Sequence, residues 1–148
     1  MAQKRPAIRL PDVFIDSSVF FTAVNSPTGG SAKIFSLSGS QFHLCTSRIV
    51  LVETERNVRK KLLNLHLPRF FMLSKHVHIL NHIPRAAEIA AAQRVIAKKD
   101  AVILAEAKHA SIIYVVTLDV KHFITNDVKQ FLHPVKIVTP KELLTLKP

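Results

Sequence analysis

Cysteine, glycine and tryptophan are scarce or absent: the 148 residues include one Cys, three Gly and no Trp. The single thiol, Cys45, cannot form an internal disulfide, which favours a reducing, cytoplasmic setting and argues against a zinc site made of thiolates. No apolar run approaches the roughly 20 residues of a membrane-spanning helix. The first residues, 1–11, lack the apolar segment of a secretory signal. These absences predict a cytoplasmic protein without a membrane partner.

Negative charge is also scarce. Ten Asp and Glu residues stand against 21 Lys and Arg, which gives a formal net charge of +11. This excess favours an anionic partner, most often nucleic acid, although a basic surface can also serve solubility alone. Because 48% of the residues are hydrophobic, the chain can bury a core, and its length suits one domain. We expect a single domain over residues 12–148, preceded by a mobile lead-in at residues 1–11.

Short apolar segments alternate with segments of helical periodicity along the chain. Strands are expected at 13–16, 42–46, 77–80, 112–117 and 136–139, and helices at 17–24, 32–38, 48–63, 69–74, 84–97, 101–110 and 140–146. The alternation predicts an α/β protein: a three-layer α/β/α sandwich with a central parallel sheet of about five strands. The fourth strand is uniformly apolar, as expected for a strand that is covered on both faces.

Local signals predict where several helices begin and end. Ser17 or Ser18 is expected to cap the first helix, and Ser47 the helix that follows the second strand. Leu67–Pro68 should break this helix, which is expected at 48–63. Lys98–Lys99 should end the alanine-rich helix, because cations complement the negative end of a helix dipole.

Four acids are placed where they can meet. Asp16 ends the first strand and Asp119 follows the fourth, and the carboxyl ends of parallel strands lie along one edge of a sheet. Glu53 lies about two turns into the helix after the second strand. Asp100 is expected to open the helix that leads into the fourth strand. Four segments can therefore bring their carboxylates to one place.

Such a group of carboxylates requires a cation, because packed negative charges repel and would otherwise take up protons. Mg²⁺ and Mn²⁺ prefer oxygen ligands of this kind. Ions held by carboxylates activate water and stabilise the oxygens of a phosphodiester displacement. A basic surface around an acidic site can hold the phosphates of the substrate. The pattern therefore predicts a metal-dependent nuclease.

Five segments resemble, in order, the motifs of PIN-domain nucleases: Phe14–Phe20, Ser26–Lys33, Thr46–Glu53, Asp100–Ala107 and Val116–Phe123. The first combines an aliphatic strand, an Asp and small residues, and the third has the family's Ser, spacer and Glu on a helix. The second is similar to the loop-to-helix segment of a toxin-type subgroup. The resemblance covers about residues 13–139.

The resemblance implies a flavodoxin-like sandwich, Mg²⁺- or Mn²⁺-dependent cleavage of RNA and, often, a homodimer. Many members are VapC-type toxins that a small antitoxin protein holds inactive. The same four acids would be the metal ligands, with Ser17 and Thr117 as supporting hydroxyls. Many members carry Asn where this chain has Ser18, which affects the hydrogen bonds around the site more than the metal ligands.

The candidate acids also have ordinary structural interpretations. Acids at strand ends, such as Asp16 and Asp119, commonly form turns, and Asp100 suits a helix cap. Glu55 competes with Glu53 on one helix, but Glu53 matches the motif spacing. Each interpretation is weaker once all the candidate acids are considered together.

Other polar residues are secondary candidates. His76 and His78 would share one strand face, but no third metal ligand accompanies them, so a solvated edge is favoured. Phe70–Met72 suit a core or a dimer contact better than base stacking. The cations that follow Glu53 either form a solvated helix end or bind RNA. A histidine follows Asp119 closely and could contact the substrate. The candidate RNA contacts are Arg56, Arg59, Lys60 and His122.

Three functions are compatible with this arrangement. The first is a metal-dependent ribonuclease, supported by the four acids and the net charge. The second is a non-catalytic RNA-binding PIN-like module, supported by the charge alone. The third is a phosphoacceptor domain of similar topology, which needs paired acids at the first strand and an acceptor Asp after the third. The third strand is instead followed by Asn81 and His82, which argues against the phosphoacceptor.

Overall fold

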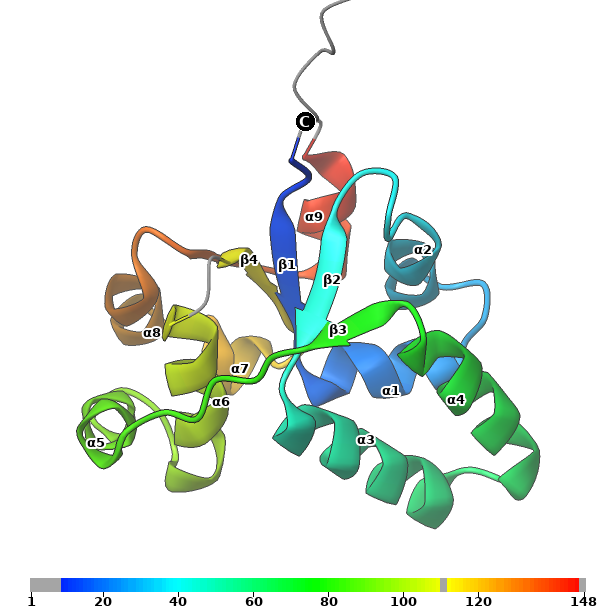
Figure 1. Ribbon diagram of the computed structural model, residues 1–148, viewed down its shortest axis with the longest axis horizontal. Coiled ribbons are helices and arrows are strands. Elements are labelled where there is room, and N and C mark those ends of the chain that lie inside the picture. The colour runs from blue at the N-terminus through cyan, green and yellow to red at the C-terminus, as the bar shows by residue number, and fades with distance from the viewer. Residues whose placement is uncertain (1–8, 110–111, 147–148) are drawn as a thin grey trace, which may run out of the picture.

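A sheet of five parallel strands forms the centre of the fold (Figure 1), as the sequence predicts. The computed structural model describes residues 9–109 and 112–146, so most of the expected lead-in lies outside the described residues. The strand order is β3-β2-β1-β4-β5, and every neighbouring pair is parallel. The strands are β1 (Asp12–Ile15), β2 (His43–Thr46), β3 (Val77–Ile79), β4 (Ile112–Val116) and β5 (Lys136–Val138). Because β1 is central, the residue that follows it has neighbours on both sides.

Helices cover both faces of the sheet and make the expected three layers. Successive strand residues point to opposite faces: Val13 and Ile15 belong to one hydrophobic core, whereas Phe14 belongs to the other. The first core is closed by α1 (Ser17–Asn25), α2 (Gly30–Ser36), α4 (Leu67–Ser74) and α9 (Pro140–Thr145). The second is closed by α5 (Ala86–Gln93), α6 (Lys98–His109), α7 (Val120–Phe123) and α8 (Asn126–Leu132).

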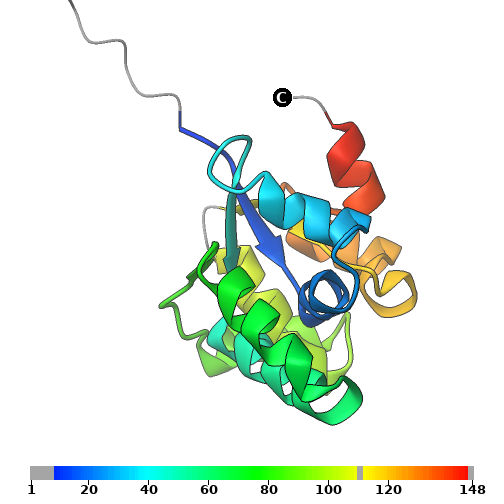
Figure 2. The ribbon, with the colours of Figure 1, turned by 90° about the vertical axis from the view of Figure 1, so that its right-hand side faces the viewer.

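Helix α3 (Arg48–Lys61) belongs to both layers. Its first turn contributes Val50 to the second core, whereas its last turns contribute Val58 to the first, and both side chains are fully buried. The helix therefore crosses below the carboxyl ends of β1 and β2, as Figure 1 shows. A short 3-10 turn, η1 (Asn64–His66), then leads into α4. In both views α9 and the start of β1 lie at the end of the molecule opposite α3 (Figures 1 and 2).

Several predicted helix ends were wrong. Asp16, not Ser17 or Ser18, caps α1, because its carboxylate accepts a hydrogen bond from the Val19 amide. Leu67–Pro68 begins α4 instead of breaking α3, since proline is tolerated in a first helical turn. The prediction that Ser47 caps α3 is confirmed, with its hydroxyl accepting from the Val50 amide.

The region before β4 also differs from the prediction. The alanine-rich helix spans only Ala86–Gln93, and Lys98–Lys99 begins α6 instead of ending its predecessor. Asp100 consequently lies in the first turn of α6, where a negative charge suits the helix dipole, and does not open the helix. Ala110, the expected end of this helix, lies outside the described residues. In β4 the side chain of Ile113 is 47% exposed, so this strand is not covered on both faces along its whole length.

No helix in residues 9–109 and 112–146 is long and apolar enough to cross a membrane.

Candidate active site

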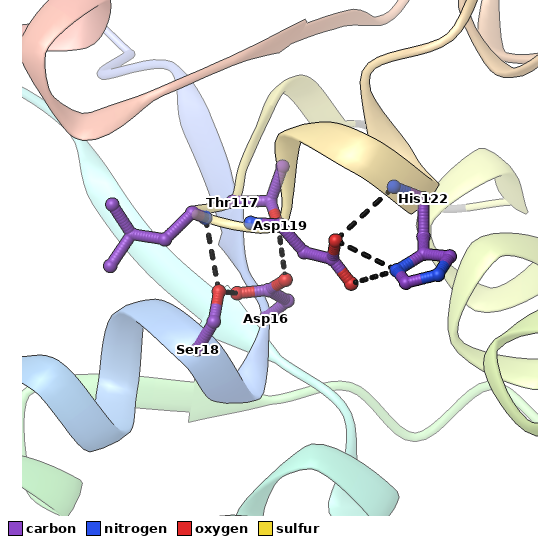
Figure 3. Close-up of polar contacts among 6 residues, drawn as sticks. Asp16, Ser18, Thr117, Asp119 and His122 are labelled. Carbon is purple, nitrogen blue, oxygen red and sulfur yellow. Dashed lines mark hydrogen bonds and ion pairs between the residues drawn. The ribbon is translucent and has the colours of Figure 1, made fainter.

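Asp16 is the most constrained of the candidate acids. It follows β1 directly and is 3% exposed. One carboxylate oxygen, Oδ1, accepts from the Ser18 hydroxyl at 2.6 Å and from the Val19 amide at 3.2 Å. The other oxygen, Oδ2, accepts a hydrogen bond from the Thr117 hydroxyl (Figure 3). Three donors from two segments therefore hold this carboxylate in one orientation.

The two hydroxyls that donate to Asp16 also bind the loop after β4. The Leu118 amide donates to the Ser18 hydroxyl oxygen at 3.0 Å, and the Asp119 amide donates to the Thr117 hydroxyl oxygen at 3.0 Å. Each hydroxyl thus links the carboxylate at the end of β1 to the backbone that follows β4 (Figure 3). This linkage places Asp119 beside Asp16, as strand topology predicts for the two strand ends.

The Asp119 carboxylate also contacts His122, on the side away from Asp16 (Figure 3). Its Oδ1 accepts from the His122 amide at 3.2 Å and thereby caps α7. The His122 ring nitrogen Nδ1 lies 3.0 Å from Oδ1 and 3.1 Å from Oδ2 (Figure 3). The side chain of Asp119 is 33% exposed and that of His122 is 51% exposed. This pair therefore forms the open side of the site.

The environment of Asp16 disfavours its charge. Burial raises the pKa of its carboxyl to about 6, against hydrogen bonds from Ser18, Thr117 and Val19 that lower it, and the negative charge of Asp119 raises it further. A buried carboxylate that is held ionised next to another acid favours a nearby cation. Perturbed acids of this kind concentrate at functional sites.

Asp100 and Glu53 belong to the same electrostatic neighbourhood. Burial raises the pKa of the Asp100 carboxyl, and the negative charges of Glu53 and Asp119 act in the same direction. The positive charges of Lys99 and His122 oppose this rise. Asp100 therefore interacts with acids from α3 and from the loop after β4, and Asp119 in turn interacts with Asp16.

A groove of about 700 Å³ runs along α3 from these acids. Glu53 and Asp100 line it together with exposed aliphatic side chains, Ile49 and Val52. The cations that line it are Arg48, Arg56, Lys60 and Lys99. Among the predicted RNA contacts, Arg56 and Lys60 therefore border the groove. The guanidinium of Arg59 instead lies 3.4 Å from the carboxylate of Glu55 on the same helix.

The donor chemistry of the four acids fits a hard divalent cation, because it consists of carboxylate oxygens. Burial and the charge of neighbouring acids raise the pKa of two of them, Asp16 and Asp100. The side chains do not yet form a coordination shell. Across the described parts of the chain, no three Asp, Glu, His or Cys side chains are close enough together to hold a metal ion. Glu53 and Asp100 line one groove, and Asp119, which acts on both Asp100 and Asp16, connects them electrostatically to the buried acid.

The structure assigns different partners to several secondary candidates. The hydroxyl that contacts Asp16 belongs to Ser18 and not to Ser17, because Ser18 lies on the side of the first helical turn that faces the carboxylate. His76 and His78 are exposed beside or on edge strand β3, as the solvated interpretation expects. Phe70 is buried in the first core, whereas Phe71 and Met72 are 47% and 48% exposed.

Sequence reasoning missed Arg48 and Lys99 as groove residues. Arg48 follows the cap residue Ser47 at the site edge, and Lys99 immediately precedes Asp100. Their adjacency to the motif residues is a signal that could have identified them. The role of Ser18 could have been inferred from the Asp-x-Ser spacing, which is typical of a side chain that hydrogen-bonds locally.

Comparisons with known proteins agree with this geometry. A family model of the PIN domain matches residues 13–127. No curated protein sequence matches the chain significantly. A similar solved structure is the DNA-bound VapBC of Salmonella typhimurium, with 17% identity over 88% of this chain and 99% of that chain and a TM-score of 0.66. VapBC2 of Rickettsia felis, bound to a DNA fragment from their promoter, has 14% identity over 86% and 98% and a TM-score of 0.65. FitAcB of Neisseria gonorrhoeae has 21% identity over 87% and 98% and a TM-score of 0.56. At such identities the likeness shows a shared fold.

Proposed function

Because the chain belongs to the PIN-domain family, whose members are generally nucleases that use divalent metal ions, we propose that it is an Mg²⁺- or Mn²⁺-dependent endoribonuclease. The observation that carries this proposal is the buried carboxylate of Asp16, which three donors hold in place beside the acid Asp119. The pKa of this carboxyl is raised to about 6, and acids perturbed in this way concentrate at functional sites.

Asp16, Glu53, Asp100 and Asp119 would hold the ion. Asp16 supplies the fixed ligand, since its oxygens are already oriented. The more exposed side chains, Glu53 and Asp119, would turn toward it when the ion binds. A divalent ion in such a site activates water for attack on a phosphodiester and stabilises the charge that develops. Ser18 and Thr117 fix the orientation of the Asp16 carboxylate and hold the Asp119 loop beside it.

The groove along α3 would bind the RNA backbone. Its cations, among them Arg56 and Lys60, are exposed, and they lie next to the acids Glu53 and Asp100. Lys and Arg contact phosphates without reading sequence, so this side of the site would position the strand and not select it. His122 lies at the open edge, where it could contact the substrate next to Asp119.

The experiment is cleavage of a labelled single-stranded RNA by the full chain with Mn²⁺ or Mg²⁺. We expect cleavage that EDTA abolishes and that Asp16→Asn abolishes too, with the fold intact by circular dichroism. Internal fragments, as opposed to single nucleotides, would show an endonuclease. Cleavage that persists in EDTA or in Asp16→Asn would overturn the proposal.

A non-catalytic RNA-binding module is the second candidate. The observation in its favour is that no metal-binding group of three side chains is formed within residues 9–109 and 112–146, whereas the basic surface is extensive. It predicts salt-sensitive RNA binding that is indifferent to Asp16→Asn and to divalent ions. The cleavage experiment separates the two candidates, because only the nuclease loses its function with Asp16.

We further propose that the protein is cytoplasmic, forms a homodimer and is controlled by a small antitoxin protein. Two of the solved structures that share its fold are VapBC complexes. Co-expression with the product of the neighbouring reading frame, followed by size-exclusion chromatography with light scattering, tests both partners. An antitoxin should co-elute with the chain and suppress RNA cleavage, whereas the chain alone should elute with twice its monomer mass.

A further inference from the structure

A cavity of about 660 Å³ lies at the amino-terminal end of the sheet, away from the proposed metal site. Its lining comes from the first residues of the strands β1, β2, β3 and β4 and from the segments just before β2 and β3. In Figure 1 the helices α5 and α6 of the second layer lie toward the carboxyl ends of β1 and β2, and the cavity opens over the opposite ends of these strands. Cavities of this size commonly hold small ligands.

The register of the sheet gathers histidines on one face of this cavity. Cys45 belongs to the second core, and because successive strand residues alternate between faces, His43 points to the same side as Cys45. His78 is the residue of β3 that pairs with Cys45, so it lies on this face as well. His76 precedes β3 directly, two positions before His78. All three histidines are exposed, and all three line the cavity.

These histidines are not used by the fold. Within residues 9–109 and 112–146, the side chains of His43, His76 and His78 make no hydrogen bond or ion pair. Lys75, which is also exposed, lines the same cavity and has no such partner in these residues either. Imidazole and ammonium groups are hydrogen-bond donors. The cavity therefore has four side chains whose donors are available to a ligand.

Ser38 holds the wall of the cavity in place. Its hydroxyl donates to the His76 carbonyl at 3.0 Å and accepts from the Leu44 amide at 3.4 Å. One side chain thus ties the loop before β2 to the turn before β3. The next residue, Gly39, has a φ of +89°, which favours glycine, and its amide donates to the Phe42 carbonyl at 2.8 Å. The backbone that carries the histidines is therefore fixed before any ligand binds.

The charge of the lining favours an anion over a metal ion. The one acid among the lining residues that the structure describes is Asp12, and its carboxylate lies 3.5 Å from the guanidinium of Arg9. Burial, and then the negative charge of Asp12, raises the pKa of the Cys45 thiol to about 12, so this thiol is neutral and is not a thiolate ligand. In the described ranges no three His, Cys, Asp or Glu side chains are close enough together to hold a metal.

We propose that this cavity binds a phosphate monoester, either that of a free nucleotide or the 5′-phosphate of an RNA. Such a group carries nearly two negative charges and three strong acceptor oxygens at neutral pH. These match the ammonium of Lys75 and the imidazoles of the three histidines. Leu80 and Ile112 also line the cavity and would contact the organic part of the ligand. Because the site is separate from the four acids, the inference does not rest on the proposed nuclease function.

The test is isothermal titration calorimetry of the full chain with adenosine monophosphate (AMP) in EDTA at about pH 6.5. Lys75→Gln and His78→Ala should each raise the Kd for AMP at least about tenfold, as expected for the loss of a hydrogen bond to a charged group. The matched controls are Lys129→Gln on α8 and His66→Ala on η1, which lie outside the cavity lining. Both should stay within about twofold of wild type.

The pH dependence of binding gives a second measurement. Histidine is the side chain that ordinarily changes its charge between about pH 5 and 8, so the Kd for AMP should be severalfold lower at about pH 6.5 than at about pH 8. A triple variant with all three histidines changed to Ala should lose this difference. The other charged groups around the histidines are Asp12, its partner Arg9 and Lys75, whose residue types ordinarily keep their charge over this range. An equal pH dependence in the triple variant would overturn the role of the histidines.

Two RNA oligonucleotides of one sequence, with a 5′-phosphate and with a 5′-hydroxyl, distinguish the sources of the phosphate. Tighter binding of the phosphorylated oligonucleotide, lost in His78→Ala, would identify an RNA end as the ligand. AMP binding without such a difference would identify a free nucleotide. Absence of binding by both AMP and the phosphorylated oligonucleotide would overturn the inference, as would equal binding to wild type, Lys75→Gln and His78→Ala.

Two further variants separate this cavity from the nuclease site. Asp16→Asn and Arg56→Ala change the proposed metal site and the groove along α3, and both should leave the Kd for AMP within about twofold of wild type. Weaker AMP binding in either variant, without a loss in His78→Ala, would place the ligand at the nuclease site and overturn the inference. Failure of the proposed function gives a different result, because it would appear only in the cleavage experiment.

Discussion

The hydroxyl of Thr117 donates a hydrogen bond to the buried carboxylate of Asp16, although the two residues lie 101 positions apart in the sequence. The same hydroxyl accepts from the Asp119 amide. One side chain therefore sets the relative position of an acid from the central strand and an acid from its neighbour. The position of the Asp119 backbone relative to Asp16 is therefore a property of the sheet, whereas the Asp119 side chain can still turn toward an ion.

The two adjacent serines after Asp16 should differ sharply in importance. Ser18→Ala removes a 2.6 Å hydrogen bond that lowers the Asp16 pKa and a contact that holds the Leu118 amide. We expect kcat/KM for RNA cleavage to fall about 10- to 100-fold, and the acidic limb of its pH profile to move to higher pH. Ser17→Ala is the matched control and should stay within about twofold of wild type. Equal losses in both variants would contradict the assignment of the hydroxyl to Ser18.

The charge on Asp16 should destabilise the metal-free protein at neutral pH. Its pKa in the folded chain is about 6, above the ordinary 3.8, so its contribution to stability is complete below pH 3.8 and is lost as the pH rises through 6. Above that window the ionised group costs about 3 kcal/mol at most. Asp16→Asn should therefore raise the free energy of unfolding by about 1–3 kcal/mol at about pH 7.5, and by close to nothing near pH 4.

Urea denaturation in EDTA across this pH range measures the difference. An Asn variant that is less stable than wild type at both pH values would show that the hydrogen bonds of Asp16 outweigh the cost of its charge. Added Mn²⁺ should stabilise the wild type and not the variant, by about 2.7 kcal/mol at one hundred times its Kd.

The groove along α3 should dominate the salt dependence of RNA binding. Arg56→Ala and Lys99→Ala each remove a cation from the groove lining. Each should reduce the slope of log K against log salt by about 0.7, the value for one lost phosphate contact with a single strand. Lys136→Ala is the matched control, because Lys136 is an exposed cation at the opposite, amino-terminal edge of the sheet. Fluorescence anisotropy in EDTA measures binding without cleavage. An equal change of the slope in Lys136→Ala would show that RNA binding is not localised to the groove.

We expect only one of the two glutamates of α3, Glu53, to be needed for catalysis. Glu53 lines the groove and raises the Asp100 pKa, whereas Glu55 pairs with Arg59 on the surface of the helix. Glu53→Gln should lower kcat/KM by at least about 100-fold. Glu55→Gln should leave it within about twofold and cost less than about 0.5 kcal/mol of stability, as exposed pairs do. Kinetics with Mn²⁺ and thermal unfolding of both variants provide the comparison, and the opposite ranking would move the ligand to Glu55.

Sequence alone was sufficient for the sheet and for the pair of acids at its edge. The apolar segments were long enough to be recognised as strands, and parallel topology then places Asp16 and Asp119 at one edge without further information. Ser47 was also predictable, because a serine before a helical pattern is a strong cap signal.

Other features depended on which of several neighbouring side chains makes a contact in the folded chain, and the order of residues alone does not reveal this. Asp16 takes the cap of α1 from the serines because its carboxylate is held over the first turn by Thr117, a residue from a distant strand. Helices α7 and α8 contain only four and seven residues, too few for a periodic pattern to predict their bounds.

Asp16 is both a helix cap and a proposed metal ligand, and these two roles affect which residues diverged relatives of this chain would retain. A lineage that lost its nuclease activity would still be selected to keep an acceptor at this position, because α1 begins on it. Glu53 neither caps a helix nor fills a core, so selection on folding alone would let it change. Among diverged homologues, the glutamate in the groove is therefore the better marker of nuclease activity, whereas an acceptor at position 16, either Asp or Asn, marks only the fold.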